Sequence, residues 1–101
     1  MDRLITENLS AIRSLCKKHS VEALDVFGSV LGNHFTDHSD VDFLVVFSRR
    51  EGLNAFHQYF EFKEALSRLL QREVELVCYR AIQNPVFKRE VDSTRKNLYA
   101  A

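Results

Sequence analysis

The sequence predicts a small α+β domain in which helices and strands alternate along the chain. Its 101 residues are enough for one modest hydrophobic core. Apolar residues make up 46% of the chain and charged residues 28%, which is typical of an ordinary folded domain. The apolar positions follow a helical period in some segments and a strand period in others. We therefore expect one domain over residues 1–101, with the element order α-β-α-β-α-β-α.

The first third of the chain is expected to form a helix, a strand and a short helical turn. Residues 3–19 carry apolar side chains at helical spacing, at Ile5, Leu9, Ile12 and Cys16. Residues 21–27 form a short strand that ends at Gly28-Ser29. Residues 29–32 can start a helical turn before a polar loop that runs to Ser39.

The middle of the chain predicts a buried strand and the longest helix. Residues 40–47 are rich in β-branched and aromatic side chains, which favours a strand. Residues 54–70 predict a core helix whose main apolar line is Tyr59, Phe62, Leu66 and Leu69. Phe56, Phe60 and Leu70 widen this apolar face, and any aromatic ring left exposed would form a partner surface.

The last third predicts a third strand and a final helix. Residues 73–79 alternate around Val74, Leu76 and Cys78. Asn84-Pro85 is a good N-cap and first-turn pair for a helix. This helix would bury Val86 or Phe87, followed by Val91, Leu98 and Tyr99.

Charge and composition exclude several classes of protein. Fourteen basic and fourteen acidic residues cancel, so the chain lacks the basic excess that holds a long nucleic acid. Its longest apolar run, near residues 43–47, is too short to cross a bilayer, and its N-terminus lacks a leader pattern. Cys16 and Cys78 form no metal or redox motif, so we expect two reduced core thiols. We expect a cytoplasmic protein.

Two carboxylates at the start of the second strand are the main chemical signal. Asp40 and Asp42 are two residues apart and therefore project from the same face of a strand. Like charges this close repel each other unless a cation neutralises them. Mg²⁺ is the hard cation that binds one or two carboxylates and completes its shell with phosphate and water. The pair therefore indicates a site for a metal ion and a nucleotide.

The turn after the first strand is a candidate phosphate site. Gly28 allows close approach of the backbone, and Ser29 adds a hydroxyl to the N–H groups of the turn. Such a turn would hold a triphosphate next to the metal ions. Taken alone, Gly-Ser and Asp-x-Asp are each common in turns and loop edges.

The spacing of these two motifs is far more specific. Gly28-Ser29, ten residues from Val30 to Ser39, and then Asp40-x-Asp42 resemble the signature of the DNA polymerase beta-like nucleotidyltransferases. Within that superfamily the chain is similar to the minimal (MNT) type, which is often paired with a HEPN-domain toxin. The resemblance also covers Gly32, the strand at Val74–Val77 and Asn84-Pro85. It implies a mixed sheet packed against helices.

The resemblance also implies roles for individual residues. Gly28 and Ser29 would bind the triphosphate, and Asp40 and Asp42 would bind two Mg²⁺ ions. The third carboxylate of the family falls on Glu75, where Asp is more common. The alternative is that Glu75 lies on an exposed sheet face without a role.

A second departure is the apolar pair Val30 and Leu31, where many relatives carry a basic residue. Arg49, Arg50 or a residue of the last helix is the candidate replacement. The basic cluster on that helix consists of Lys88, Arg89, Arg95 and Lys96, and we expect it to be a solvated face or a contact with the acceptor. His34, Asp37 and His38 are interpreted as a polar loop, because further metal ligands at a suitable spacing are missing.

The resemblance implies an ATP- and Mg²⁺-dependent adenylyltransferase that modifies a tyrosine of a HEPN toxin and so acts as an antitoxin. Two alternatives stay open. One is an inactive antitoxin that neutralises its partner by binding alone. The other is a transferase for a small molecule such as an aminoglycoside.

Overall fold

The computed structural model describes residues 2–32, 36, 38–48 and 54–101 and contains a four-stranded mixed sheet. The strands lie in the order β3-β2-β1-β4 and are β1 (Val21–Phe27), β2 (Val41–Phe47), β3 (Val74–Cys78) and β4 (Lys96–Ala100). Strand β1 is antiparallel to both β2 and β4, whereas β2 and β3 are parallel. The α+β class and the mixed sheet are thus confirmed.

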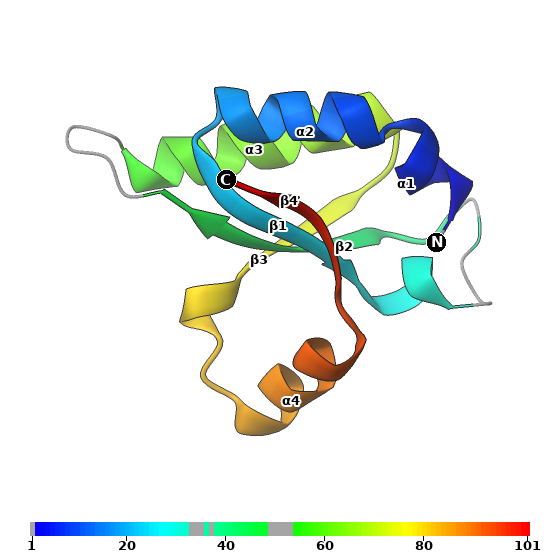
Figure 1. The fold of residues 1–101 in the computed structure, drawn as a ribbon, viewed down its shortest axis with the longest axis vertical. Coiled ribbons are helices and arrows are strands. Elements are labelled where there is room, and N and C mark those ends of the chain that lie inside the picture. Colours follow the sequence, from blue (N-terminus) through cyan, green and yellow to red (C-terminus); the bar gives the residue numbers. More distant parts are fainter. Residues whose placement is uncertain (1, 33–35, 37, 49–53) are drawn as a thin grey trace.

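Helices cover the two faces of this sheet unequally. α1 (Arg3–Glu7), α2 (Leu9–Lys18) and α3 (Ala55–Leu70) lie on one side, and α4 (Pro85–Thr94) lies on the other (Figure 1). Two short 3₁₀ turns, η1 (Gly28–Leu31) and η2 (Tyr79–Ala81), follow β1 and β3. Within the described residues, no helix combines the length and apolar character needed to span a membrane.

The N-terminal helix is interrupted, contrary to the single helix expected over residues 3–19. Asn8 has φ −104° and ψ 6°, and it ends α1 and begins α2. Its side-chain amide donates to the Leu4 carbonyl at 2.8 Å, and its backbone N–H bonds to Ile5. These bonds compete with continuous helix geometry, as asparagine commonly does. The periodicity was still informative, because Ile5, Ile12 and Cys16 are fully buried.

The predicted final helix is too long. α4 ends at Thr94 because Arg95 is extended, with ψ 148°, and the following residues form β4. Leu98 is buried in that strand, and Tyr99 is partly buried, so neither belongs to the helix. Val86 is 67% exposed, so the prediction that Val86 or Phe87 is buried holds only in part, through the half-buried Phe87. The Asn84 cap is confirmed, since its side chain accepts from Val86 and Phe87 N–H groups.

α3 matches its predicted span but turns a narrower apolar face to the sheet. Phe62, Leu66 and Leu70 are buried, together with Gln58, whose amide donates to the His19 carbonyl at 2.9 Å. Phe56 and Phe60 are 66% and 47% exposed, and their rings lie 4.6 Å apart. The expectation that these two rings widen the core face is therefore wrong.

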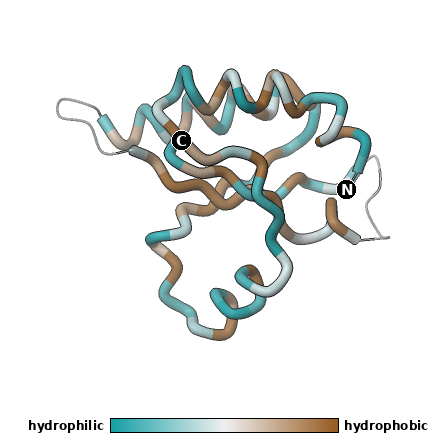
Figure 2. The backbone as a smooth tube through the Cα atoms, in the orientation of Figure 1, coloured by the Kyte–Doolittle hydropathy of each residue, from teal (hydrophilic) through white to brown (hydrophobic). Residues whose placement is uncertain are grey.

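The apolar residues form two clusters, one on each face of the sheet. Figure 2 shows hydrophobic segments concentrated in the strands. The larger cluster joins α1, α2 and α3 to the sheet and contains Val41 and Phe43. The smaller one joins α4 to the sheet through Phe27, Leu44 and Val91. Since strand side chains alternate, Asp42 shares the α4 face with Leu44.

Candidate active site

A left-handed glycine forms the turn after β1. Gly28 has φ +75°, a conformation that glycine adopts without steric cost, and it leads into the 3₁₀ turn. A left-handed residue followed by right-handed ones directs successive N–H groups into one concavity that favours anions. Gly28 is exposed and Ser29 is half-buried, so a ligand can approach this turn. The Ser29 hydroxyl donates to the Asp40 carbonyl at 3.4 Å, which links the turn to the start of β2.

Asp42 lies on β2, between β1 and β3, where the predicted site residues come together. It is opposite Phe27 on β1 and opposite Glu75 on β3. A Cβ atom on Gly28 would overlap Asp42 Oδ2, so only glycine allows the turn to lie against this carboxylate. The predicted phosphate turn and the predicted metal ligand therefore form one continuous surface.

The electrostatics of Asp42 show that it stands among other negative groups. Its pKa is raised to about 6, first by burial, then by the charge of Glu75 and a hydrogen bond with Glu75, and then by the charge of Asp40. Asp40 and Glu75 are themselves exposed. A cation bound to these carboxylates would offset the free-energy cost of burying the Asp42 charge. It would also reduce the repulsion of Asp42 by Glu75 and Asp40.

The donor set suits Mg²⁺ held jointly with a nucleotide. Among residues 2–32, 36, 38–48 and 54–101, no three His, Cys, Asp or Glu side chains converge as a ready-made metal cage. Mg²⁺ commonly takes only one or two carboxylates, and phosphates and water supply the rest of its shell. Carboxylates at the edge of the predicted phosphate-binding turn fit that arrangement.

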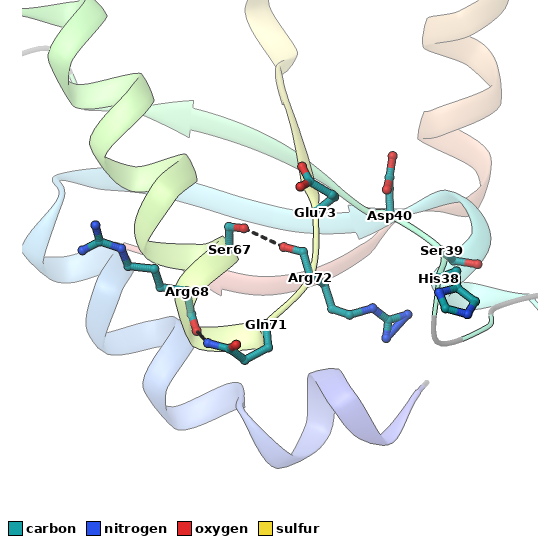
Figure 3. Close-up of a pocket in the computed structure, with 8 residues that line it drawn as sticks. All are labelled: His38, Ser39, Asp40, Ser67, Arg68, Gln71, Arg72 and Glu73. Carbon is teal, nitrogen blue, oxygen red and sulfur yellow. Dashed lines mark hydrogen bonds between the residues drawn. The ribbon is translucent and has the colours of Figure 1, made fainter.

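The sheet register adds a carboxylate that sequence analysis missed. Glu73 immediately precedes β3, and its carbonyl accepts from the Val41 N–H at 3.0 Å, which places it beside Asp40. The side chains of Asp40 and Glu73 point to the same side (Figure 3). The available signal was the two-residue spacing of Glu73 and Glu75, which repeats that of Asp40 and Asp42. The link between the two pairs requires the parallel register.

Two arginines that the sequence analysis did not single out line a pocket beside Asp40. The pocket has a volume of about 500 Å³ and is lined by Arg68, near the end of α3, and by Arg72, which follows that helix (Figure 3). Arg72 donates to the Thr36 carbonyl, and Arg68 pairs with Glu64 at 2.5 Å. Arg49 and Arg50, the candidates predicted for this role, lie outside the described residues, as do His34 and Asp37.

Arg95 is not the purely solvated side chain expected in the basic cluster. Its Nη1 atom lies 3.3 Å from Oδ2 of Asp25, whose side chain is only 12% exposed. Asn97 donates to the other Asp25 oxygen at 2.7 Å. The Arg95 guanidinium also lies 4.7 Å from the centre of the Tyr79 ring, and Tyr79 donates to Asp92 at 2.7 Å. These contacts tie the end of α4 to β1 and to η2.

The cysteine prediction is confirmed for Cys16 and partly for Cys78. Both are free thiols; Cys16 is buried and Cys78 is half-buried. Burial raises the pKa of both thiols, that of Cys16 to about 12.

A mixed sheet in which a turn with a left-handed glycine lies against an Asp-x-Asp pair is the arrangement of a nucleotidyltransferase. The profile of the family described as Polymerase beta, Nucleotidyltransferase matches residues 10–101, and the chain belongs to this family.

Relatives agree with that assignment. MJ0128 of Methanocaldococcus jannaschii, a candidate protein adenylyltransferase, is 32% identical, with 85% of this chain and 93% of that protein aligned. The solved structure of a candidate minimal nucleotidyltransferase superposes with a TM-score of 0.76 at 31% identity, covering 95% of both chains. A complex of a tri-AMPylated Shewanella oneidensis HEPN toxin with its MNT antitoxin gives a TM-score of 0.67 at 22% identity, covering 95% of this chain and 72% of that one. At that identity the last likeness concerns the fold.

Proposed function

We propose that this chain transfers AMP from ATP to a tyrosine hydroxyl of a HEPN-domain toxin and thereby acts as its antitoxin. The observation that carries the proposal is the contact between the Gly28 turn and Asp42, because it unites a phosphate-binding backbone with a carboxylate. The relatives support the choice of AMP and of a protein acceptor: one is named a protein adenylyltransferase, and another is an MNT antitoxin with an AMPylated toxin.

In this reaction the tyrosine oxygen forms a bond to the α-phosphorus of ATP. The bond from the α-phosphorus to the oxygen that bridges it to the β-phosphate breaks, and pyrophosphate leaves. The hydroxyl proton passes to water or to a carboxylate of the site. Mg²⁺, when bound, would neutralise the phosphates and stabilise the charge that develops on the leaving group.

Each site residue has a distinct task in this proposal. N–H groups after Gly28 would hold the triphosphate. The Ser29 hydroxyl, which donates to the Asp40 carbonyl at 3.4 Å, would turn to donate to a phosphate oxygen instead. Asp40 and Asp42 would hold two Mg²⁺ ions, and Glu75 beside Asp42 would be the third carboxylate. Its position opposite Asp42 in the parallel register of β2 and β3 supports this assignment, since it brings the longer Glu side chain beside the predicted metal-binding pair. The cytoplasm, where ATP and Mg²⁺ are plentiful, is the compartment that suits the reaction.

The test is transfer of label from α-labelled ATP. The purified chain is incubated with Mg²⁺ and the nucleotide, alone and with the protein that co-purifies from its host, and labelled tyrosine is located by mass spectrometry. Wild type should label an excess of partner, and the Asp40→Asn/Asp42→Asn double variant should not. Glu61→Gln, on the exposed side of α3, is the control that should retain full activity.

Each alternative has its own outcome in this experiment. A tight complex without label, in which neutralisation needs equal amounts of the two proteins, would replace the proposal with a binding-only antitoxin. Turnover of a purified aminoglycoside in the absence of a partner would indicate the small-molecule transferase. Full activity of the double variant would exclude the metal-binding role of the Asp pair.

A further inference from the structure

A second cavity, which shares no lining residue with the arginine-lined pocket, lies beside the predicted phosphate turn. It has a volume of about 380 Å³ and opens between η1 and α4. Gly28 forms one edge of it, so the cavity is continuous with the proposed triphosphate site. Any group that is covalently linked to phosphates at Gly28 can therefore reach it.

The walls of this cavity are apolar and aromatic. Phe27 and Leu31 line one side, and Phe87 and Val91 line the side formed by α4. The Phe27 and Phe87 rings meet edge to face, with centroids 6.0 Å apart. Apolar and aromatic walls of this kind favour a flat heteroaromatic ring over an ion or a sugar. The arginine-lined pocket at Asp40 is polar by comparison and suits a charged group.

The rim of the cavity presents hydrogen-bond acceptors. Glu90 and Thr94 lie one turn apart on α4, and the Glu90 carboxylate pairs with none of the described side chains. The Thr94 hydroxyl already donates to the Glu90 backbone carbonyl at 3.0 Å, so its remaining capacity is as an acceptor. An acceptor-rich rim is complementary to a base edge that carries an amino group.

We propose that this cavity binds the base of the nucleotide and that Glu90 selects an amino-bearing purine, such as adenine. The inference rests on the proposed function for the position of the phosphates. It goes further by assigning α4 as the element that chooses the nucleotide. The exocyclic amino group would donate to Glu90, while the ring packs against Phe87.

The experiment compares binding of two nucleotides that differ only in this amino group. Calorimetric titration of the full chain, with Mg²⁺ and without a partner, should show that ATP binds about tenfold more tightly than purine riboside triphosphate. Glu90→Ala should reduce this ratio to about one. Phe87→Leu should weaken the binding of both nucleotides by the same factor, because it alters the wall of the cavity and leaves Glu90 and Thr94 at the rim unchanged. Val86→Ala, exposed on the same helix, should change neither affinity.

Thermal unfolding monitored by circular dichroism shows whether each variant remains folded. The assignment would be overturned if Glu90→Ala kept the wild-type ratio of the two nucleotide affinities. It would also be overturned if wild type bound both nucleotides equally well or bound neither. Altered labelling of the partner at constant nucleotide affinity would assign the cavity to the acceptor instead. Selective binding without any transfer of label would refute the proposed function and leave the base site standing, so the two failures are distinguishable.

Discussion

Gly28 lies against Asp42 so closely that the first carbon of any side chain at residue 28 would occupy the position of a carboxylate oxygen. Gly28→Ala should therefore displace Asp42 and strain a backbone with φ +75°. We expect transfer of AMP to fall by more than about tenfold and the free energy of unfolding to fall by about 1 kcal/mol.

Gly32→Ala is the matched control, because an added Cβ there would meet only the Ser29 carbonyl at an ordinary 3.7 Å. Activity assays and denaturant unfolding measure both effects. Equal activity of the two variants would contradict the proposed coupling between the turn and the carboxylate.

Glu75 should matter more than its neighbour Glu73. Glu75 lies opposite Asp42 and its charge helps to raise the Asp42 pKa, whereas Glu73 lies beside Asp40 just before the strand. We expect Glu75→Gln to lower the rate of transfer by about 100-fold, the size of effect typical for loss of a charged group at a metal-assisted site. Glu73→Gln should cost less than about tenfold in the same labelling assay. The reverse order would move the third ligand to Glu73.

Arg95→Met should destabilise the protein because it leaves the Asp25 carboxylate buried without its cation. We expect the free energy of unfolding, measured with denaturant, to fall by about 2 kcal/mol. The fall is smaller than for a fully buried ion pair because the Arg95 side chain is 35% exposed.

Arg80→Met breaks an ion pair with Glu22 in which both side chains are at least half exposed, and it should cost less than about 0.5 kcal/mol. The Asp25→Asn/Arg95→Met double variant should recover part of the loss, which a double-mutant cycle measures. A strictly additive cycle would show that the two side chains do not interact.

His19 should make stability depend on pH. It caps α2 and lies 5.6 Å from the Phe62 ring, and burial, assisted by the Lys18 charge, lowers its pKa below 6.5. The folded protein therefore holds fewer protons than the unfolded chain in this window. Stability is fully present above pH 6.5 and is lost as pH falls through that value towards the lower folded pKa.

The expected result is a smaller decrease in melting temperature between pH 7.5 and pH 5 for His19→Gln than for wild type. The exposed His57→Gln is its control and should behave like wild type. Parallel curves for all three proteins would show that His19 does not contribute.

The two thiols should react slowly and at different rates. Burial raises the pKa of Cys16 to about 12, and Cys78, which is half-buried, also has a raised pKa. Since the thiolate is the reactive form, a maleimide at pH 7.5 should label Cys78 first and Cys16 only on unfolding. Mass spectrometry with Cys78→Ser as the single-site reference gives the order. Rapid native labelling of Cys16 would place it outside the core.

The sequence was most informative where one local pattern determines an element. Residues 21–27, 40–47 and 73–79 were predicted as strands from β-branched runs and alternation, and the structure agrees to within a residue at each end. The final strand was wrongly predicted as part of a helix. Leu98 and Tyr99 lie seven and eight residues after Val91, a spacing that also fits a helix. Pairing with β1 decides the matter, and that contact spans most of the chain.

The same distinction holds at the site. The fixed spacing of the Gly-Ser and Asp-x-Asp motifs is a local pattern, and it was enough to predict the turn and the carboxylate pair. The meeting of Asp42 with Glu75 depends on parallel register between β2 and β3, which no short motif encodes. The Asp25 and Arg95 ion pair joins residues 70 positions apart and had no local signal.

The pairing of β4 with β1 has a consequence for the order in which the molecule assembles. Ala100 lies opposite Ala23, so this closure joins residues 77 positions apart in the sequence and carries a large loop entropy. During synthesis β1, β2 and β3 emerge before α4, and α4 can pack on the sheet through Phe27, Leu44 and Val91 before residues 96–100 pair with β1. The strands that carry Asp42 and Glu75 are thus synthesised before the strand that joins the end of α4 to β1.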